Sequence, residues 1–71
     1  MEAETKRILE NIRKIRLKKK ISGMNLALDV GISHSHLYYI ESMRVSPSID
    51  VLVRIAKSLN VPLGELIDLS D

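Results

Sequence analysis

The side chains with the most versatile hydrogen-bonding chemistry gather in one short stretch of the chain. Residues 33–42 read SHSHLYYIES, and neutral serine, histidine and tyrosine side chains can each donate and accept hydrogen bonds. The stretch contains no lysine, arginine or cysteine. This mixture suits a partner that presents both donors and acceptors, and the base edges in the major groove of duplex DNA are such a partner.

Metal binding and catalysis receive little support from the same residues. His34 and His36 stand two positions apart, so on a helix their side chains would diverge by about 200°. The chain has no cysteine to complete a zinc site. Its serines, histidines and acidic residues form no nucleophile–base motif. The sequence therefore predicts no enzyme, no metal site and no cofactor.

Apolar residues at helical spacing indicate that the polar stretch lies on a helix that other helices hold in place. Leu37 and Ile40 give the stretch one apolar edge and predict a helix over about 34–42. The same reasoning predicts helices over about 4–19 and 23–30, from Ser46 or Ser48 to about 59, and over about 62–69. The predicted fold class is therefore all-α, a compact five-helix bundle with short loops.

The second and third predicted helices form a helix-turn-helix over about 23–42. Ser22 and Ser33 are suited to cap their N-termini, because serine accepts a backbone N–H. Ala27 is small where the two helices must approach, and Gly31 suits the turn because glycine adopts the left-handed conformation freely. Pro47 suits the first turn of the fourth helix, and Asn60 suits its C-terminal end.

The helical periodicity also predicts which side chains of residues 34–42 point away from the core. At about 100° per residue, Ser35 lies opposite the apolar edge and the two tyrosines lie about 130° from it. If this helix enters the major groove, its N-terminal residues meet base edges. The candidates for base contact are Ser33, His34, Ser35 and Tyr39. Tyr38 and His36 are candidates for phosphate or flanking contacts, although Tyr38 also fits a core position with a solvated hydroxyl.

Charge is distributed unevenly along the chain. Residues 1–22 hold eight lysine and arginine residues against three acidic residues, whereas the whole chain has a net charge of +2. A basic segment favours a polyanionic partner, and a solvated helix face explains it equally well. The candidates for phosphate contact are Ser22 and Gly23 at a helix N-terminus, Arg44 and Ser46 in the loop after the third helix, and the lysine run 18–20.

Length and composition limit the kind of protein. Seventy-one residues make one small domain, predicted to span 1–71, and 45% hydrophobic residues make it globular. The absence of cysteine excludes disulfides. No long apolar stretch indicates a signal peptide or a membrane span, which predicts a cytoplasmic protein without a membrane partner.

An ordered set of short matches extends over most of the chain. The stretches IRKIR at 12–16, LA at 26–27, VGIS at 30–33 and LYYIE at 37–41 are followed by Pro47-Ser48 and the apolar runs 52–59 and 61–66. In this order they resemble the lambda-repressor-like family (Cro/repressor, Xre-type) of helix-turn-helix proteins. The resemblance implies a homodimer that binds a pseudo-palindromic DNA operator and regulates transcription, more commonly as a repressor.

The resemblance also implies roles for particular residues. It carries base reading onto His34, Ser35 and Tyr39, and it pairs Arg16 with Glu41 in a salt bridge between the first and third helices. The last helix is the expected dimer surface, through Leu63, Leu66, Ile67 and Leu69, although ordinary core packing explains Leu66 and Leu63 as well.

The chain departs from the family pattern at several positions. Gly23 replaces a usual glutamine, and Lys20 and Met43 stand where glycines are common. A non-glycine residue with positive φ is uncommon, so the turn at Met43 is expected to close differently. These departures, and a recognition helix without basic residues, keep an alternative open. The alternative is a protein-interaction module, such as an antitoxin or a regulator controlled by a protein partner. A membrane-surface peptide is disfavoured, because the core needs the isoleucines of the first helix.

Overall fold

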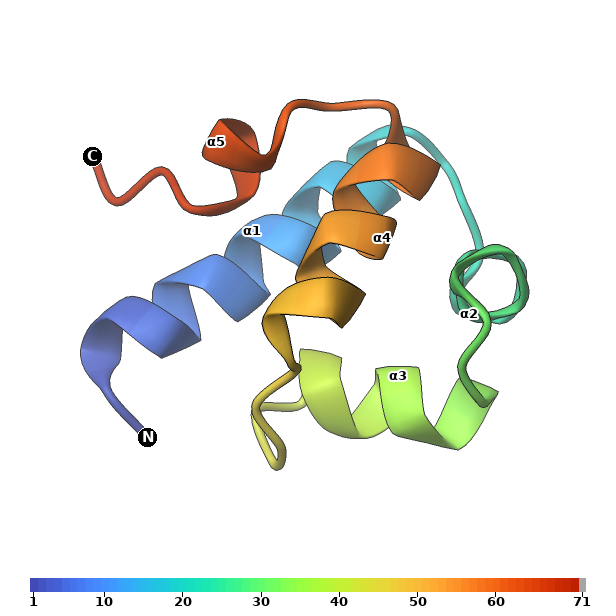
Figure 1. The fold of residues 1–71 in the computed structure, drawn as a ribbon, viewed down its shortest axis with the longest axis horizontal. Coiled ribbons are helices and arrows are strands. Elements are labelled where there is room, and N and C mark those ends of the chain that lie inside the picture. Colours follow the sequence, from blue (N-terminus) through green and yellow to red (C-terminus); the bar gives the residue numbers. More distant parts are fainter. Residues whose placement is uncertain (71) are drawn as a thin grey trace.

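The computed structural model describes residues 1–70, and within them the chain folds into five helices and no strand (Figure 1). The all-α prediction is therefore confirmed. The helices are α1 (Ala3–Lys18), α2 (Gly23–Val30), α3 (His34–Glu41), α4 (Ile49–Leu59) and α5 (Leu63–Leu66). The final residue of the predicted domain, Asp71, lies outside the described residues.

Side chains and left-handed residues set most helix boundaries, as the sequence predicted. The hydroxyl oxygens of Ser22, Ser33 and Ser48 accept backbone N–H groups at the starts of α2, α3 and α4, with donor–acceptor distances of 2.9–3.1 Å. Gly31 ends α2 with φ 85°, and Asn60 ends α4 with φ 59°. These caps satisfy backbone groups that a helix end leaves without partners.

Two predictions about helix ends were wrong. Of the two predicted starts of the fourth helix the structure has Ser48, but Pro47 precedes this capping residue and so lies outside α4 rather than in its first turn. The last helix was expected to reach about residue 69, but α5 ends at Leu66. Where α5 ends, the side-chain amide of Asn11 on α1 donates hydrogen bonds of 2.9 Å to the carbonyls of both Leu66 and Asp68. This side chain satisfies two backbone carbonyls of the C-terminal segment, so that segment needs no further helical turn there.

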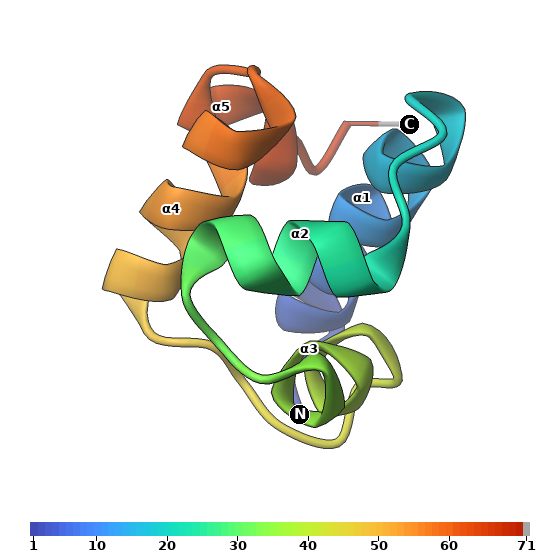
Figure 2. The same cartoon turned by 90° about the vertical axis from the view of Figure 1, so that its right-hand side faces the viewer.

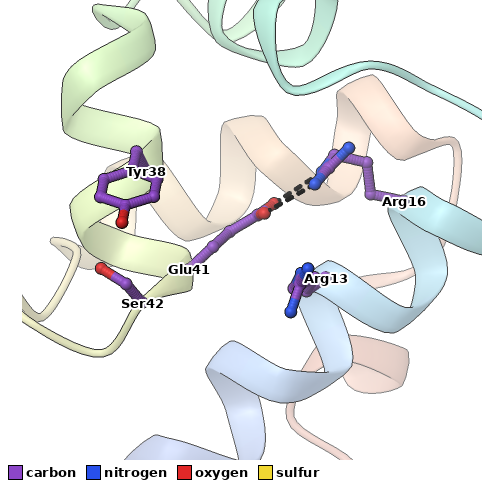
Figure 3. Close-up of a pocket in the computed structure, with 5 residues that line it drawn as sticks. All are labelled: Arg13, Arg16, Tyr38, Glu41 and Ser42. Atoms are coloured by element: carbon purple, nitrogen blue, oxygen red, sulfur yellow. Dashed lines mark hydrogen bonds and ion pairs between the residues drawn. The ribbon is translucent and has the colours of Figure 1, made fainter.

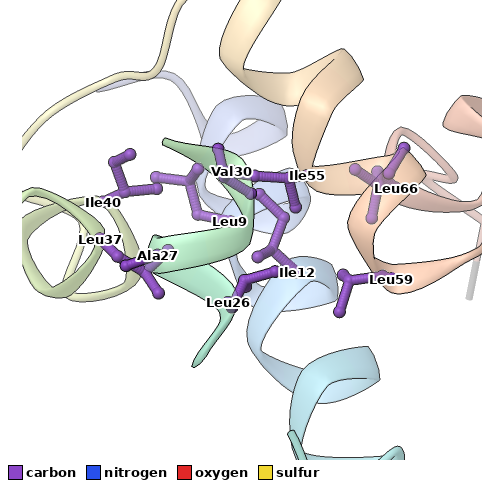
Figure 4. Close-up of a cluster of buried hydrophobic side chains, with 11 residues drawn as sticks. Leu9, Ile12, Leu26, Ala27, Val30, Leu37, Ile40, Ile55, Leu59 and Leu66 are labelled. Carbon is purple, nitrogen blue, oxygen red and sulfur yellow. The ribbon is translucent and has the colours of Figure 1, made fainter. Parts of the chain in front are cut away.

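One apolar core joins all five helices (Figure 4). Its largest fully buried side chains are Leu9, Ile12, Leu26, Leu37, Ile40, Ile55, Leu59 and Leu66. Helix α2 contacts both α3 and α4, and α1 contacts α3, α4 and α5. Viewed from the side of the helix-turn-helix, α2 crosses above α3, with the turn between them at one end (Figure 2). The core thus fixes α3 at the periphery with one face left uncovered.

Two non-glycine residues occupy turns where the family often has glycine. Lys20 has φ 58° and Met43 has φ 64°, both in the left-handed region. The expectation that the turn at Met43 closes differently was therefore wrong. The turn is held by hydrogen bonds from the Met43 and Arg44 N–H groups to the carbonyls of Ile40 and Tyr39, at 3.0 and 2.8 Å, and Met43 packs against the core. These contacts offset a conformational cost of about 1 kcal/mol.

No helix in the described part of the chain is both long enough and apolar enough to cross a bilayer.

Candidate DNA interface

The exposed face of α3 presents a shallow hollow of about 270 Å³ lined by His34, Ser35, Tyr38 and Tyr39. These four side chains belong to two successive turns of one helix. Tyr38 is 57% exposed and Tyr39 is 42% exposed, so the alternative that buried Tyr38 in the core was wrong. The hollow brings hydroxyl and imidazole groups together beside aromatic ring faces.

This face is presented to solvent because the opposite edge of α3 is anchored. Leu37 is 1% exposed and Ile40 is fully buried. At the N-terminal end, the Ile32 N–H donates to the Ala27 carbonyl at 3.0 Å across the Gly31 turn. The anchored edge and the tight turn together fix the rotation of α3 about its own axis.

An aromatic and cationic cluster closes the C-terminal end of this face. The rings of Tyr38 and Tyr39 meet edge to face, with centroids 5.8 Å apart. The Arg44 guanidinium carbon lies 5.9 Å from the centroid of each ring. Such cation–π contacts orient the guanidinium. The loop after α3 thus supplies a positive charge to a helix that has no lysine or arginine of its own.

An ion pair joins α1 to α3, and the structure places it where the family resemblance implied (Figure 3). Arg16 Nε donates to Glu41 Oε2 at 2.7 Å, and Arg16 Nη2 donates to Glu41 Oε1 at 2.8 Å. The two side chains are only 12% and 10% exposed. The hydrogen bond to Glu41 raises the pKa of Arg16. A third bond, from Arg16 Nη1 to the Ile21 carbonyl at 2.8 Å, ties the pair to the loop before α2.

A contact that the sequence did not reveal lies at the start of α2. A Cβ atom on Gly23 would stand 3.3 Å from Nε2 of His34 and 3.9 Å from Cζ of Arg16. Gly23 therefore leaves room for the His34 imidazole to pack over the first turn of α2. The sequence presented Gly23 only as the loss of a glutamine, because a contact between residues eleven positions apart follows from the angle between helices.

The structure leaves the remaining candidates accessible. Exposed residues are Ser22, Ser33, His34, Ser35, His36, Tyr38, Tyr39, Arg44 and Ser46, and Gly23 is half-buried. Ser22 and Ser33 already use their hydroxyl oxygens as helix caps. Within residues 1–70, no three histidine, cysteine or acidic side chains are grouped to hold a metal ion.

The helix-turn-helix geometry agrees with a match to a known family. The sequence profile of a helix-turn-helix family matches residues 12–66. The chain belongs to the lambda-repressor-like helix-turn-helix family. The match covers α1 through α5 except for the first turns of α1. Membership makes the chain a DNA-binding regulator of the helix-turn-helix class rather than an enzyme.

Solved structures share the fold at low sequence identity. The restriction-modification controller protein C.AhdI from Aeromonas hydrophila is 23% identical, with a TM-score of 0.85 over 92% of this chain and 98% of that chain. A hypothetical transcription factor, NHTF from Neisseria, is also 23% identical, with a TM-score of 0.81 over 90% of this chain and 73% of that chain. No curated protein matches the sequence. At this identity the likeness establishes the arrangement of the helix-turn-helix.

Proposed function

We propose that this chain is a sequence-specific transcriptional regulator, acting in the cytoplasm as a repressor, that binds a pseudo-palindromic operator as a homodimer. The observation that carries the proposal is the uncovered face of α3, where His34, Ser35 and Tyr39 stand together opposite the buried anchors Leu37 and Ile40. Insertion of this face into the major groove brings their donors and acceptors to base edges. The likeness to a restriction-modification controller protein supports a role in regulation.

The proposed contacts divide into base reading and backbone positioning. Ser33, His34 and Ser35 lie at the N-terminal end of α3, Tyr39 lies one turn after Ser35 on the same face, and these four residues read bases. His36, Tyr38 and Arg44 contact the flanking backbone, where Arg44 supplies a cation that Tyr38 and Tyr39 orient. The N–H groups at the start of α2, near Ser22 and Gly23, and the loop residue Ser46 give further phosphate contacts.

The proposed dimer surface contains fewer residues than the sequence predicted. Leu66 is fully buried and Leu63 packs against the core, so neither offers a full side-chain surface to a second copy. Ile67 and Leu69 are 45% and 48% exposed just beyond α5. We expect Ile67→Glu to shift the monomer–dimer equilibrium toward monomer in sedimentation equilibrium without lowering the thermal midpoint of the monomer.

In vitro selection of random duplex DNA with the purified protein, at low salt and near neutral pH, tests the proposal. Enrichment of inverted repeats whose half-sites lie about 34 Å apart, one helical turn, supports a dimeric regulator. Enrichment of a single half-site supports sequence-specific binding by a monomer and removes the homodimer. Recovery of random sequences only, with salt-sensitive binding, removes the sequence-specific regulator.

A second candidate is a protein-interaction module whose own DNA binding is weak. Met24 and Leu28 favour it, because they lie one turn apart on the outer face of α2 and are 57% and 73% exposed. This candidate predicts unenriched DNA in the selection experiment. It also predicts that Leu28→Ser abolishes regulation in cells without changing the weak DNA binding of the purified chain.

A further inference from the structure

A second hollow lies beside the one formed by His34, Ser35, Tyr38 and Tyr39. It opens between α1 and α3 (Figure 3). Its volume is about 320 Å³, and it is lined by Arg13, Arg16, Tyr38, Glu41 and Ser42. Arg13 and Arg16 come from α1, and the other three residues come from α3 and its C-terminal cap. All five have polar side chains, so the hollow suits a polar or charged ligand rather than an apolar one.

The charges lining this hollow leave one positive charge without a partner. Glu41 uses both carboxylate oxygens to accept hydrogen bonds from Arg16, so these two residues neutralise each other. Arg13 is exposed, and within residues 1–70 its side chain makes no hydrogen bond or ion pair. Glu10, one turn earlier on α1, lines the adjoining hollow with Arg13, but no ion pair joins them. The hollow therefore favours a ligand with a single negative charge.

Two neutral hydroxyl groups complement Arg13. The Tyr38 and Ser42 hydroxyls face each other on the α3 side of the hollow, and Arg13 lies across the hollow on α1 (Figure 3). The Ser42 hydroxyl donates a long hydrogen bond of 3.4 Å to the Tyr39 carbonyl, and a stronger acceptor in the hollow would redirect it. A guanidinium group with two hydroxyl donors is a suitable set for the oxygens of a phosphate group.

The location of the hollow identifies the source of that phosphate. Tyr38 lines both this hollow and the base-reading hollow of His34, Ser35 and Tyr39, so the two adjoin at this side chain. A duplex that receives α3 in its major groove carries a sugar–phosphate strand along each side of the helix. In that arrangement the strand on the α1 side would pass Tyr38, the residue that the two hollows share, on the side where Arg13 lies.

We propose that Arg13, Tyr38 and Ser42 form a binding site for one backbone phosphate of duplex DNA, which holds α3 in the groove from the α1 side. This inference rests on the proposed function and adds a contact from α1, a helix outside the helix-turn-helix. The Arg16–Glu41 pair forms the rigid wall of the site. It keeps the Glu41 carboxylate from repelling the phosphate.

The salt dependence of DNA binding tests this site. Each phosphate neutralised by a basic side chain contributes about −0.9 to the slope of log K against log salt concentration for B-form DNA. The probe is a fluorescein-labelled duplex of fixed, unselected sequence, titrated with the full chain from about 50 to about 200 mM KCl. The variants are Arg13→Gln, the neighbouring control Lys14→Gln, and Tyr38→Phe. Lys14 is also exposed on α1 but does not line the hollow.

We expect Arg13→Gln to weaken binding about fivefold at the low-salt end and to make the slope less steep by about 0.9. Lys14→Gln keeps a slope close to that of the original chain. Tyr38→Phe weakens binding but leaves the slope unchanged, because it removes a hydrogen bond and no charge. Arg13→Lys restores the slope. Circular dichroism checks that Arg13→Gln is folded, as its exposed position leads us to expect.

Equal slopes for Arg13→Gln and Lys14→Gln, with the original chain binding the duplex, overturn the phosphate site and leave the proposed function intact. A Tyr38→Phe variant that binds as tightly as the original chain also counts against the site. Absence of any DNA binding by the original chain at about 50 mM KCl overturns the proposed function and the phosphate site together.

Discussion

Helices α1 and α3 lie against each other, yet they carry opposite kinds of chemistry. Helix α1 holds six lysine and arginine residues against two glutamates, whereas α3 has no lysine or arginine and presents serine, histidine and tyrosine side chains. Between them stands the Arg16–Glu41 pair, which takes one charge from each helix. The lysine and arginine charges are therefore concentrated on α1 and the uncharged hydrogen-bonding groups on α3, and the ion pair fixes one helix to the other.

The largest expected effect comes from breaking that connection. Glu41→Ala leaves the nearly buried Arg16 guanidinium without its partner, and we expect it to lower the free energy of unfolding by about 2–4 kcal/mol. Urea unfolding followed by circular dichroism measures the change. Glu10→Ala removes an exposed glutamate of α1 and serves as the control. If Glu41→Ala unfolds at the same urea concentration as this control, the pair does not hold the two helices together.

The second largest effect concerns the hydrogen-bonding side chains of α3. His34→Ala and Ser35→Ala each remove an exposed donor and acceptor, so we expect each to cost about 1–3 kcal/mol of discrimination between a selected operator and a scrambled duplex. Fluorescence anisotropy with both duplexes measures the discrimination. Binding to the scrambled duplex is the internal control and stays the same. Equal losses on both duplexes would assign these residues to the DNA backbone instead.

A smaller effect tests the contact between α2 and α3. Gly23→Ala places a Cβ 3.3 Å from Nε2 of His34 and displaces the imidazole, so we expect operator affinity to fall by about 1 kcal/mol. Gly64→Ala is the matched control, because a Cβ there meets no atom within 4 Å. Thermal melts of both variants separate binding from folding. Unchanged affinity for Gly23→Ala would mean that the position of His34 over α2 does not matter for binding.

The smallest effect concerns the end of α1. Lys20 has φ 58°, so Lys20→Gly is expected to raise the free energy of unfolding by about 0.5–1 kcal/mol by relieving a left-handed side chain. Its neighbour Lys19 has φ −84°, where glycine gives no such relief. Lys19→Gly therefore lowers stability slightly, although both variants remove one positive charge. Chemical denaturation of the two variants compares them, and shifts of the same sign would contradict the conformational explanation.

Much of the fold could be predicted from the sequence because its boundaries are local. The serine caps and the left-handed residues Gly31 and Asn60 act within a few positions of their own helices. The end of α5 was missed because it depends on Asn11, which lies more than fifty positions earlier in the chain. Periodicity carries no information about a side chain that reaches across the bundle.

The candidate site also has one part that could be predicted from the sequence and another part that could not. The outward direction of Ser35, Tyr38 and Tyr39 follows from their spacing relative to Leu37 and Ile40. The position of His34 over Gly23 depends on the crossing of two helices, and the unpartnered Arg13 depends on the side-by-side arrangement of α1 and α3. The spacing of residues in the sequence indicates which side chains share one face of a helix. Which faces of different helices contact each other is known only from the folded structure.

The face of α3 that carries His34, Ser35 and Tyr39 has no lysine or arginine. This affects how the protein would move along duplex DNA before it reaches its operator. In the proposed complex the base-reading residues His34, Ser35 and Tyr39 include no lysine or arginine, so the basic groups outside α3 would supply the counterion release on any sequence. The number of released counterions is then the same on the correct and the incorrect sequence. We therefore expect added salt to shorten the residence time on correct and on incorrect sequences by a similar factor.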